Sequence, residues 1–346
     1  MLRVMVVFGG RSGEHEVSLA SARAILDTLG ESGSYEVSPV GITKKGRWLS
    51  SGDPMSELES RSPGDNSLPV TVSDKLPTNL GHADVVFPVL HGPYGEDGTI
   101  QGMLELAGIP YVGSGVLASA AGMDKVTMKK IFAYHNLPQV EWLGLTKEDW
   151  SGNREQLLRE TADFLGYPCF VKPSNLGSSV GISKSQNSEE LEAAIDIAAE
   201  LDRRIIVEAA ADAREIEVAV LGNEEPKVSV SGEIVVGSHD FYDYEAKYTE
   251  GESEVLAPAD IPDEAADEIR EIARVAFKAI DAAGMARIDF FLERDTNRVL
   301  LNEINTIPGF TPTSVYARLW DASGLTYAEL LDELIRLAIE RHKAKF

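Results

Sequence analysis

The sequence contains a single cysteine, Cys169, among 346 residues. One thiol cannot form an internal disulfide framework or a cysteine-based zinc cluster, so both are excluded. Long apolar runs are also missing, because no segment approaches the roughly eighteen consecutive apolar residues of a membrane span. Residues 1–10 lack the basic start of a signal peptide and are typical of a strand instead. We therefore expect a cytoplasmic protein.

Positive charge is scarce, with 32 lysine and arginine residues against 56 aspartate and glutamate residues and a net charge of −24. Such a surface repels nucleic acid and anionic lipid, so neither is an expected partner. Any phosphate-binding site must therefore be a local basic pocket. Hydrophobic residues make up 43% and charged residues 25% of the chain, which excludes a largely disordered or fibrous protein. The length predicts two or three domains.

The first part of the chain alternates between strand-like and helical segments. In order, these segments are residues 2–8, 14–29, 84–90 and 99–107. A glycine-rich turn at 9–13 separates the first strand from the first helix. This alternation predicts a parallel α/β domain over residues 1–121. Residues 50–82 are rich in Ser, Pro, Gly and Asp, and we expect them to form an elaborated surface connection.

The pattern changes at Asp124, where a helix begins and a second domain is predicted. Further elements follow, as strands at 167–171, 204–208, 215–222 and 227–236, and as helices at 187–201, 263–283 and 327–342. Asn187 and Glu190 form a capping-box pattern that supports the start of the first of these helices. Cys169 lies within an apolar run and is predicted to be a small core residue.

A hairpin near the end of the chain gathers oxygen-bearing side chains. It consists of two strand-like segments and a three-residue turn, at 286–292, 299–305 and 295–297. This turn places Asp289 opposite Glu303 and Arg287 opposite Asn305, all on one face. Three oxygen donors beside an arginine suit magnesium held together with nucleotide phosphates. A solvated hairpin face with cross-strand ion pairs is the alternative.

Two glycine-rich segments invite comparison with phosphate-binding loops. Residues 174–181 can cradle phosphates through backbone N–H groups beside Lys172. However, the Gly-x-x-x-x-Gly-Lys-Ser/Thr spacing is absent, and the segment joins two predicted strands, so a surface turn remains an open alternative. Residues 9–13 miss the full dinucleotide fingerprint, which makes NAD binding a minor alternative.

Other polar residues have both a structural and a functional interpretation. Glu14 and Glu16 lie in the first turn of a predicted helix, where the macrodipole favours negative charge. His91 follows a buried strand, at the edge where open α/β sheets bind ligands. Residues 240–248 mix tyrosines with charged side chains, and an exposed aromatic loop of this kind is typical of a lid or an interface.

Seven segments together resemble the D-alanine–D-alanine ligase family of ATP-grasp enzymes, and they occur in the family's order along the whole chain. They are residues 9–18 (GGRSGEHEVS), 91–98 (HGPYGEDG), 123–125 (MDK), 172–181 (KPSNLGSSVG), 242–248 (YDYEAKY), 287–289 (RID) and 302–311 (NEINTIPGFT). The resemblance implies an α/β protein, α+β in its C-terminal part, with an ATP-grasp fold and an N-terminal Rossmann-like domain. The implied domains are 1–121, 122–212 and 213–346, the last with a lid at 237–252.

The resemblance also implies roles for individual residues. The implied ATP-binding residues are Lys125, Lys172, Ser179, Val180, Glu208 and Glu215. The implied ligands of two magnesium ions, which manganese can replace, are Asp289, Glu303 and Asn305. The implied substrate-binding residues are His91, Lys247, Ser314 and Val315. The implied catalytic residues are Arg287 and Gly309 at the oxyanion and a hydrogen-bonded trio of Glu14, Ser178 and Tyr248.

The implied reaction joins two D-alanines for peptidoglycan synthesis. The first D-alanine attacks the γ-phosphate of ATP to form an acyl phosphate, and the amine of the second displaces phosphate. A homodimer is also implied. One segment departs from the family pattern next to the implied nucleotide pocket, because alanines at 209–211 follow Glu208 where a bulky apolar residue and a glycine are usual. The alternatives are another ATP-grasp carboxylate–amine ligase and a non-catalytic nucleotide-binding regulator.

Overall fold

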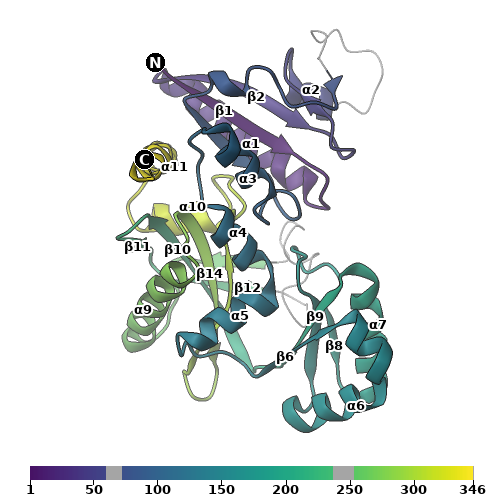
Figure 1. Cartoon of the computed structure of the whole chain (residues 1–346). Coiled ribbons are helices and arrows are strands. Elements are labelled where there is room, and N and C mark those ends of the chain that lie inside the picture. The colour runs from purple at the N-terminus through teal and green to yellow at the C-terminus, as the bar shows by residue number, and fades with distance from the viewer. Residues whose placement is uncertain (60–71, 237–252, 346) are drawn as a thin grey trace.

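The computed structural model describes residues 1–59, 72–236 and 253–345. Its strands form three sheets of five, four and six strands, each built from a different part of the chain (Figure 1). No helix among the described residues has the length and apolar character needed to cross a membrane. The α/β class predicted from the sequence is confirmed, whereas the domain boundaries at 121/122 and 212/213 stay predictions.

The N-terminal sheet has parallel strands at its centre, as predicted. β1 (Leu2–Gly9) lies between β2 (Tyr35–Ile42) and β5 (Val85–Val89) and is parallel to both. Alternate residues of β1 face opposite sides, so one set packs against α1 (His15–Ser32) and the other against α3 (Thr99–Ala107). Burial on both faces explains the continuous apolar runs of these strands. The sequence prediction did not include β2.

The connection predicted at 50–82 contains short elements of its own. They are α2 (Pro54–Glu59), β4 (Val72–Ser73) and a 3-10 helix at Leu80–His82, and β3 (Trp48–Leu49) precedes them. β3 and β4 extend the N-terminal sheet by antiparallel pairing beyond β2. Residues 60–71 of this connection lie outside the described residues.

The four-stranded sheet follows in the order β6-β9-β7-β8 and is antiparallel. Its strands are β6 (Trp142–Thr146), β7 (Cys169–Pro173), β8 (Ser183–Ser185) and β9 (Arg204–Ala209), and α6 (Lys147–Leu165) and α7 (Ser188–Leu201) pack on it. The Asn187 side chain accepts the N–H of Glu190 at 3.0 Å, which caps α7 as predicted. Cys169 is fully buried in this core, and burial raises the pKa of its thiol to about 11.

The six-stranded sheet has the order β13-β12-β10-β14-β15, with β11 paired to β10. Its strands are β10 (Ala213–Gly222), β11 (Lys227–Val228), β12 (Gly232–Val236), β13 (Ser253–Leu256), β14 (Gly284–Glu293) and β15 (Val299–Asn305). Helices α4 (Val116–Met123), α5 (Lys125–Tyr134) and α9 (Asp263–Ala279) share a core with it. Helix α9 ends four residues before the predicted end at 283.

The hairpin of β14 and β15 shows that the predicted turn was wrong. The N–H of Glu293 donates to the carbonyl of Arg298 at 3.0 Å, which closes the loop between them. The loop therefore has four residues and starts one residue before the predicted turn at 295–297. Because pairing is set by the turn, the partners near this loop are offset by one residue from the prediction.

A bulge in β15 restores the predicted pairing at the other end of the hairpin. Asn302 has no residue opposite it, and beyond it Asp289 faces Glu303 and Arg287 faces Asn305. The extra residue of the bulge compensates for the extra residue of the loop. The predicted alignment of these four polar residues is confirmed, although the turn that led to it is not.

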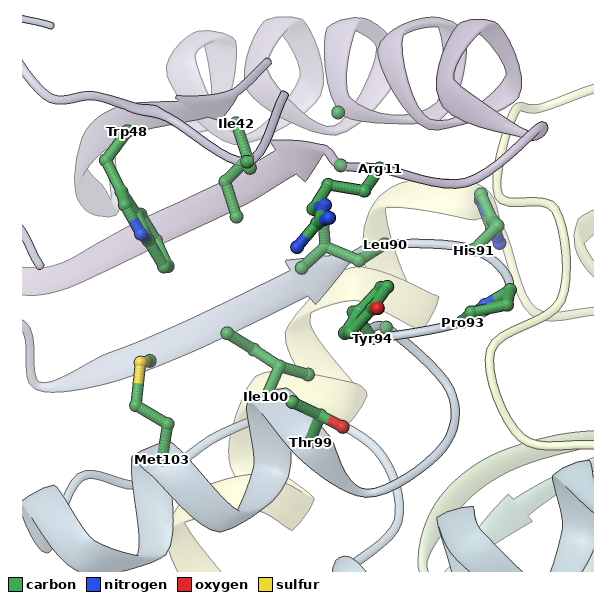
Figure 2. A pocket seen from close by; sticks show the side chains of 14 residues that line it. Arg11, Ile42, Trp48, Leu90, His91, Pro93, Tyr94, Thr99, Ile100 and Met103 are labelled. Carbon is green, nitrogen blue, oxygen red and sulfur yellow. The ribbon is translucent and has the colours of Figure 1, made fainter. Parts of the chain in front are cut away.

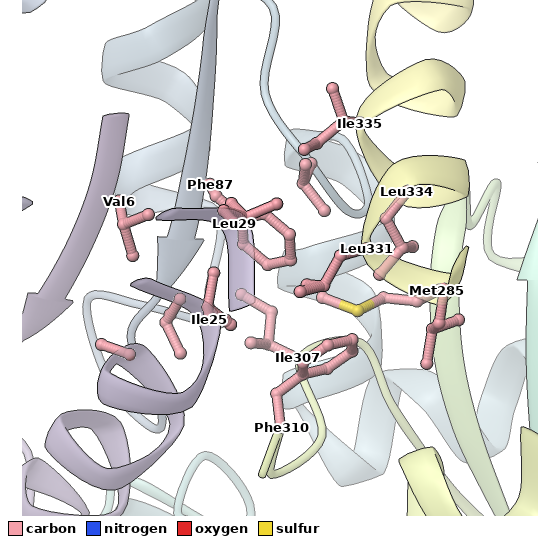
Figure 3. Packing of buried hydrophobic residues seen from close by; sticks show 14 of the residues in the cluster. Val6, Ile25, Leu29, Phe87, Met285, Ile307, Phe310, Leu331, Leu334 and Ile335 are labelled. Atoms are coloured by element: carbon pink, nitrogen blue, oxygen red, sulfur yellow. The ribbon is translucent and has the colours of Figure 1, made fainter. Parts of the chain in front are cut away.

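A hydrophobic core shared by the two ends of the chain joins the N-terminal sheet to the six-stranded sheet (Figure 3). Phe310 is 1% exposed, and its ring centroid lies 5.8 Å from that of Phe87 on β5 and 5.6 Å from that of Tyr327. Helix α11 (Tyr327–Ala344) adds buried leucines against α1. The N–H of Phe310 also donates to Ser21 Oγ of α1 at 3.0 Å.

We predict that Phe310→Ala destabilises the whole chain, because it removes a buried ring that three elements share. The expected cost is about 3–5 kcal/mol of unfolding free energy, seen as a lower melting temperature in calorimetry. Phe164→Ala is the matched control, since Phe164 on α6 is 54% exposed and its loss should cost within about 0.5 kcal/mol. Equal melting temperatures for both variants would contradict the shared core.

Candidate active site

A cavity with a volume of about 550 Å³ lies between the four-stranded and six-stranded sheets. Strands β7, β9, β10, β14 and β15 each place at least one charged side chain in its wall. These residues are Lys172, Glu208, Glu215, Glu217, Asp289 and Glu303. Two aromatic rings from different sheets, Phe170 and Phe291, also line it. The cavity thus combines apolar walls with clustered charge, which suits a nucleotide.

A buried cluster of three charges forms one wall. Lys172 Nζ lies 2.5 Å from one carboxylate oxygen of Glu208, and Lys129 Nζ lies 2.7 Å from the other. Burial alone would raise the pKa of Glu208, but the two ammonium groups lower it to about 2. Burial lowers the pKa of Lys129. Burial also opposes the charge of Lys172, but the Glu208 carboxylate outweighs it and raises the pKa of Lys172. Only Lys172 and Glu208 of the three reach the cavity.

The loop at 174–181 joins β7 to β8, as the sequence predicted, and borders this cavity. Ser178 and Ser179 have φ values of 50° and 58°, so two consecutive non-glycine residues adopt the left-handed conformation. Such backbone strain is often found where a loop contacts a ligand. Lys125 Nζ donates to the carbonyl of Leu176 at 2.9 Å, which places the first predicted phosphate ligand against this loop. Val180 is 42% exposed.

Two of the three hairpin residues predicted to bind metal, Asp289 and Glu303, line the same cavity. Arg287 donates to both oxygens of Asp289, at 2.8 and 2.7 Å, and its Nε lies 3.0 Å from Glu217. Glu303 Oε2 lies 3.8 Å from Lys125 Nζ, and the Asn305 side chain accepts the N–H of residue 307 at 3.0 Å.

Within residues 1–59, 72–236 and 253–345, no three His, Cys, Asp or Glu side chains are grouped as metal ligands. The carboxylate and amide oxygens of Asp289, Glu303 and Asn305 are nevertheless the donor type that magnesium prefers. The residues present therefore fit the ion, and their role as its ligands stays a prediction.

Glu14 connects the N-terminal sheet to the loop at 174–181. It precedes α1 at the N-cap position but makes no side-chain capping bond, and instead accepts a hydrogen bond from Ser178 Oγ. A Cβ atom at Gly92 would lie 2.8 Å from Glu14 Oε2, and one at Gly177 would lie 2.9 Å from it. A side chain at either position would therefore push the Glu14 carboxylate out of its present place. Two of the three residues of the predicted trio are therefore in contact.

His91 lies fully buried beside Glu96, at the end of β5. Its Nδ1 is 2.9 Å from the carbonyl of Ile307 and 3.4 Å from Glu96 Oε1. Burial raises the pKa of Glu96 to about 7. Burial opposes protonation of His91, but the neighbouring carboxylate raises the pKa of the imidazole. The imidazole therefore keeps its proton to higher pH beside this carboxylate than burial alone would allow.

Three predicted residues lie where the chain enters α10 (Val315–Ala322). Ser314 caps the turn before this helix, accepting the N–H of Thr311 at 3.0 Å, and Val315 is its first residue. A Cβ at Gly309 would lie 3.3 Å from Ser314 Oγ, so these positions adjoin each other. Lys247 and Tyr248, with the rest of the lid predicted at 237–252, lie outside the described residues.

Four residues that the sequence analysis did not assign to the site belong to it by position. Glu217 and Asn302 line the cavity, Glu96 contacts His91, and Lys129 contacts Glu208. Lys129 lies one helical turn after Lys125, and Glu217 alternates with Glu215 along β10, so periodicity offered a signal for both. Asn302 lines the cavity from the bulge, and no sequence signal marks a bulge there.

Two family models match the chain. A model described as the N-terminus of D-ala D-ala ligase matches residues 3–114, and a model described as its C-terminus matches residues 131–336. A D-alanine–D-alanine ligase of Bacillus velezensis is 48% identical over 98% of this chain and 98% of its own length. One from a Thermoanaerobacter strain is 49% identical over 99% and 98% of the two chains.

Solved structures agree with these relatives. A D-alanine–D-alanine ligase from Coxiella burnetii has a TM-score of 0.82 at 36% identity and covers 99% of this chain and 95% of its own. A D-Ala:D-Ser ligase from Enterococcus faecalis has a TM-score of 0.83 at 37% identity and covers 97% of this chain and 99% of its own. The fold, the site and both family models agree: this chain belongs to the D-alanine–D-alanine ligase family.

Proposed function

We propose that the chain uses ATP to join two D-alanines into D-alanyl-D-alanine, a peptidoglycan precursor, with release of ADP and phosphate. The observation that carries the proposal is the hydrogen bond between Ser178 and Glu14. It brings a carboxylate of the N-terminal sheet to the loop that borders the nucleotide-sized cavity. A substrate held by Glu14 therefore lies next to the phosphates of a nucleotide bound between the other two sheets.

In the first step, Glu14 binds the ammonium group of the first D-alanine and His91 approaches its carboxylate. A carboxylate is a poor electrophile, so its oxygen attacks the γ-phosphate of ATP, forming an acyl phosphate and releasing ADP. Lys125 and Lys172 offset the charge that develops on the phosphates. Two magnesium ions, when bound by Asp289, Glu303 and Asn305, would add positive charge there.

In the second step, the amine of the second D-alanine attacks the acyl carbon, loses a proton and displaces phosphate. Lys247, Ser314 and Val315 bind the carboxylate of this second substrate. Arg287 and the N–H of Gly309 stabilise the oxyanion of the tetrahedral intermediate. Because Glu217 and Asp289 both contact the guanidinium of Arg287, its position is fixed before the charge develops, which is the condition for effective electrostatic stabilisation.

The experiment that tests this function measures phosphate release and the products formed from D-alanine, ATP and Mg²⁺, with each component omitted in turn. We expect one phosphate to be released per dipeptide formed. No turnover should occur when D-alanine, ATP or Mg²⁺ is left out. Addition of D-serine or D-lactate tests the substrate alternatives, since one structural relative is a D-Ala:D-Ser ligase. Nucleotide binding without any product would favour the regulatory alternative.

We also propose a homodimer that works in the cytoplasm, where ATP is supplied. Sedimentation of the purified chain distinguishes a dimer from a monomer, and fractionation of cells with an antibody to the chain tests its location.

We predict that Glu303→Gln and Asp289→Asn each lower turnover by about 10²-fold or more, since each removes a charge at the developing phosphate. Asp295→Asn is the matched control, because Asp295 is exposed in the loop of the same hairpin and its loss should leave turnover unchanged. Circular dichroism checks the fold of each variant. Near-normal turnover of the folded Glu303→Gln variant at saturating Mg²⁺ would reject the metal assignment.

A further prediction concerns the buried charges around Glu208. Glu208→Gln leaves Lys129, which is 1% exposed, without its counter-charge, and should cost about 3–5 kcal/mol of stability. Adding Lys129→Met should recover part of this loss. Glu192→Gln is the control, because it breaks an exposed ion pair with Arg154 and should cost at most about 1 kcal/mol.

The pH dependence follows from the same carboxylate. The pKa of Glu208 is about 2 in the folded chain, against an ordinary value of 4.5. The folded state therefore binds fewer protons than the unfolded state between these values, and the stabilisation is lost as the pH falls through them. Urea unfolding at several pH values should show the gap between the unmodified chain and Glu208→Gln narrowing in acid. A gap independent of pH would show that Glu208 carries no stabilising charge.

A further inference from the structure

A second cavity lies within the N-terminal domain, and the loop that carries His91 forms part of its wall (Figure 2). Its volume is about 170 Å³. The walls are mainly apolar, with Ile42, Leu90 and Ile100 buried and Trp48 and Met103 half-buried. An apolar cavity of about 150 Å³ is large enough to bind benzene. This one therefore has room for a single six-membered ring.

The mouth of this cavity is built by Arg11 and Tyr94. The guanidinium carbon of Arg11 lies 5.0 Å from the centre of the Tyr94 ring, in cation–π contact. Tyr94 has a φ of 70°, an unfavourable conformation for a bulky residue, and its N–H donates to Asp97 at 2.9 Å. A Cβ at Gly46 would lie 2.8 Å from Arg11 Cδ. Stacking and close packing thus hold the arginine in place at the opening.

Arg11 supplies a positive charge at this mouth. In the part of the chain that the structure describes, no carboxylate lies within ion-pair distance of it. An arginine held in place beside an apolar ring-sized space recognises an anionic group attached to an apolar body.

We propose that this cavity binds a small monocyclic aromatic carboxylate, with its ring among Trp48, Leu90 and Met103 and its carboxylate at Arg11. The loop of residues 90–95 lines the cavity and also carries His91, which is itself part of the cavity wall. A ligand bound in this cavity therefore changes the binding of the first D-alanine at His91. This coupling to D-alanine binding rests on the proposed function, whereas the binding of the aromatic carboxylate does not.

Benzoate is the probe, and the tryptophan fluorescence of the unmodified chain is the first readout. Trp48 lines this cavity, and none of the other three tryptophans does. We expect a saturable change with a Kd on the order of 1 mM or tighter, as befits a ligand of so few atoms. Benzamidine has the same ring with the opposite charge and should give no saturable change. No response to benzoate, or an equal response to both compounds, would overturn the site.

Variants locate the binding, read by saturation-transfer NMR of the free ligand. Met103→Trp fills the cavity and should abolish benzoate binding, and Leu106→Trp is the matched control because Leu106 is on the same helix and 94% exposed. Arg11→Gln should weaken benzoate about ten-fold while leaving binding of toluene unchanged. Equal benzoate binding by the Met103→Trp and Leu106→Trp variants would place the ligand elsewhere.

The coupling to catalysis is tested last. Benzoate at saturation should change the KM for D-alanine at least about two-fold in the unmodified chain and in Leu106→Trp, but not in Met103→Trp. Binding without any change in KM would overturn the coupling and leave the site intact. A chain that binds benzoate but forms no dipeptide would refute the proposed function and not the site.

Discussion

The structure depends on one short segment, residues 307–310, which ties the N-terminal sheet to the hairpin. The carbonyl of Ile307 contacts His91, the N–H of Phe310 donates to α1, and the Phe310 ring fills the shared core. The same segment begins two residues after Asn305 of the hairpin. Residues from opposite ends of the chain are thereby held in fixed positions. Without this anchor, the proposed first-substrate residues would have no defined distance to the proposed metal residues.

Positively charged side chains gather at the candidate site although the chain as a whole is strongly negative. The protein carries a net charge of −24, yet Lys125 and Lys172 line the nucleotide-sized cavity and Arg287 lies next to Asp289 of its wall. Each of these three cations lies near a carboxylate. Lys172 contacts Glu208, and Arg287 contacts Glu217 and Asp289. These pairings keep the cations in place while no phosphate is bound. A nucleotide triphosphate would therefore meet donors that are already positioned, which lowers the reorganisation cost of catalysis.

Much of the fold and site could be predicted because it depends on local patterns. The alternation of apolar strand-like runs with helical segments predicted the parallel N-terminal sheet. Motif residues such as Asp289 and Glu303 reach one cavity, as their pairing predicted. What sequence reasoning missed depends on tertiary structure. Helical periodicity places Lys129 on the same face as Lys125, but it cannot show that Lys129 is buried against a carboxylate, because lysine is normally exposed. The bulge at Asn302 depends on how two strands pair, and the shared core depends on how α11 packs, so neither leaves a local pattern.

The proposed function requires that a nucleotide bound between the four-stranded and six-stranded sheets lies beside a substrate held by Glu14 of the N-terminal domain. A crystal structure of the chain with D-alanine, Mg²⁺ and a non-hydrolysable ATP analogue tests it most directly. We expect the base between Phe170 and Phe291, the phosphates at Lys125 and Lys172, and D-alanine at Glu14. D-alanine bound away from Glu14, or phosphates on the far side of the cavity from residues 176–181, would contradict it.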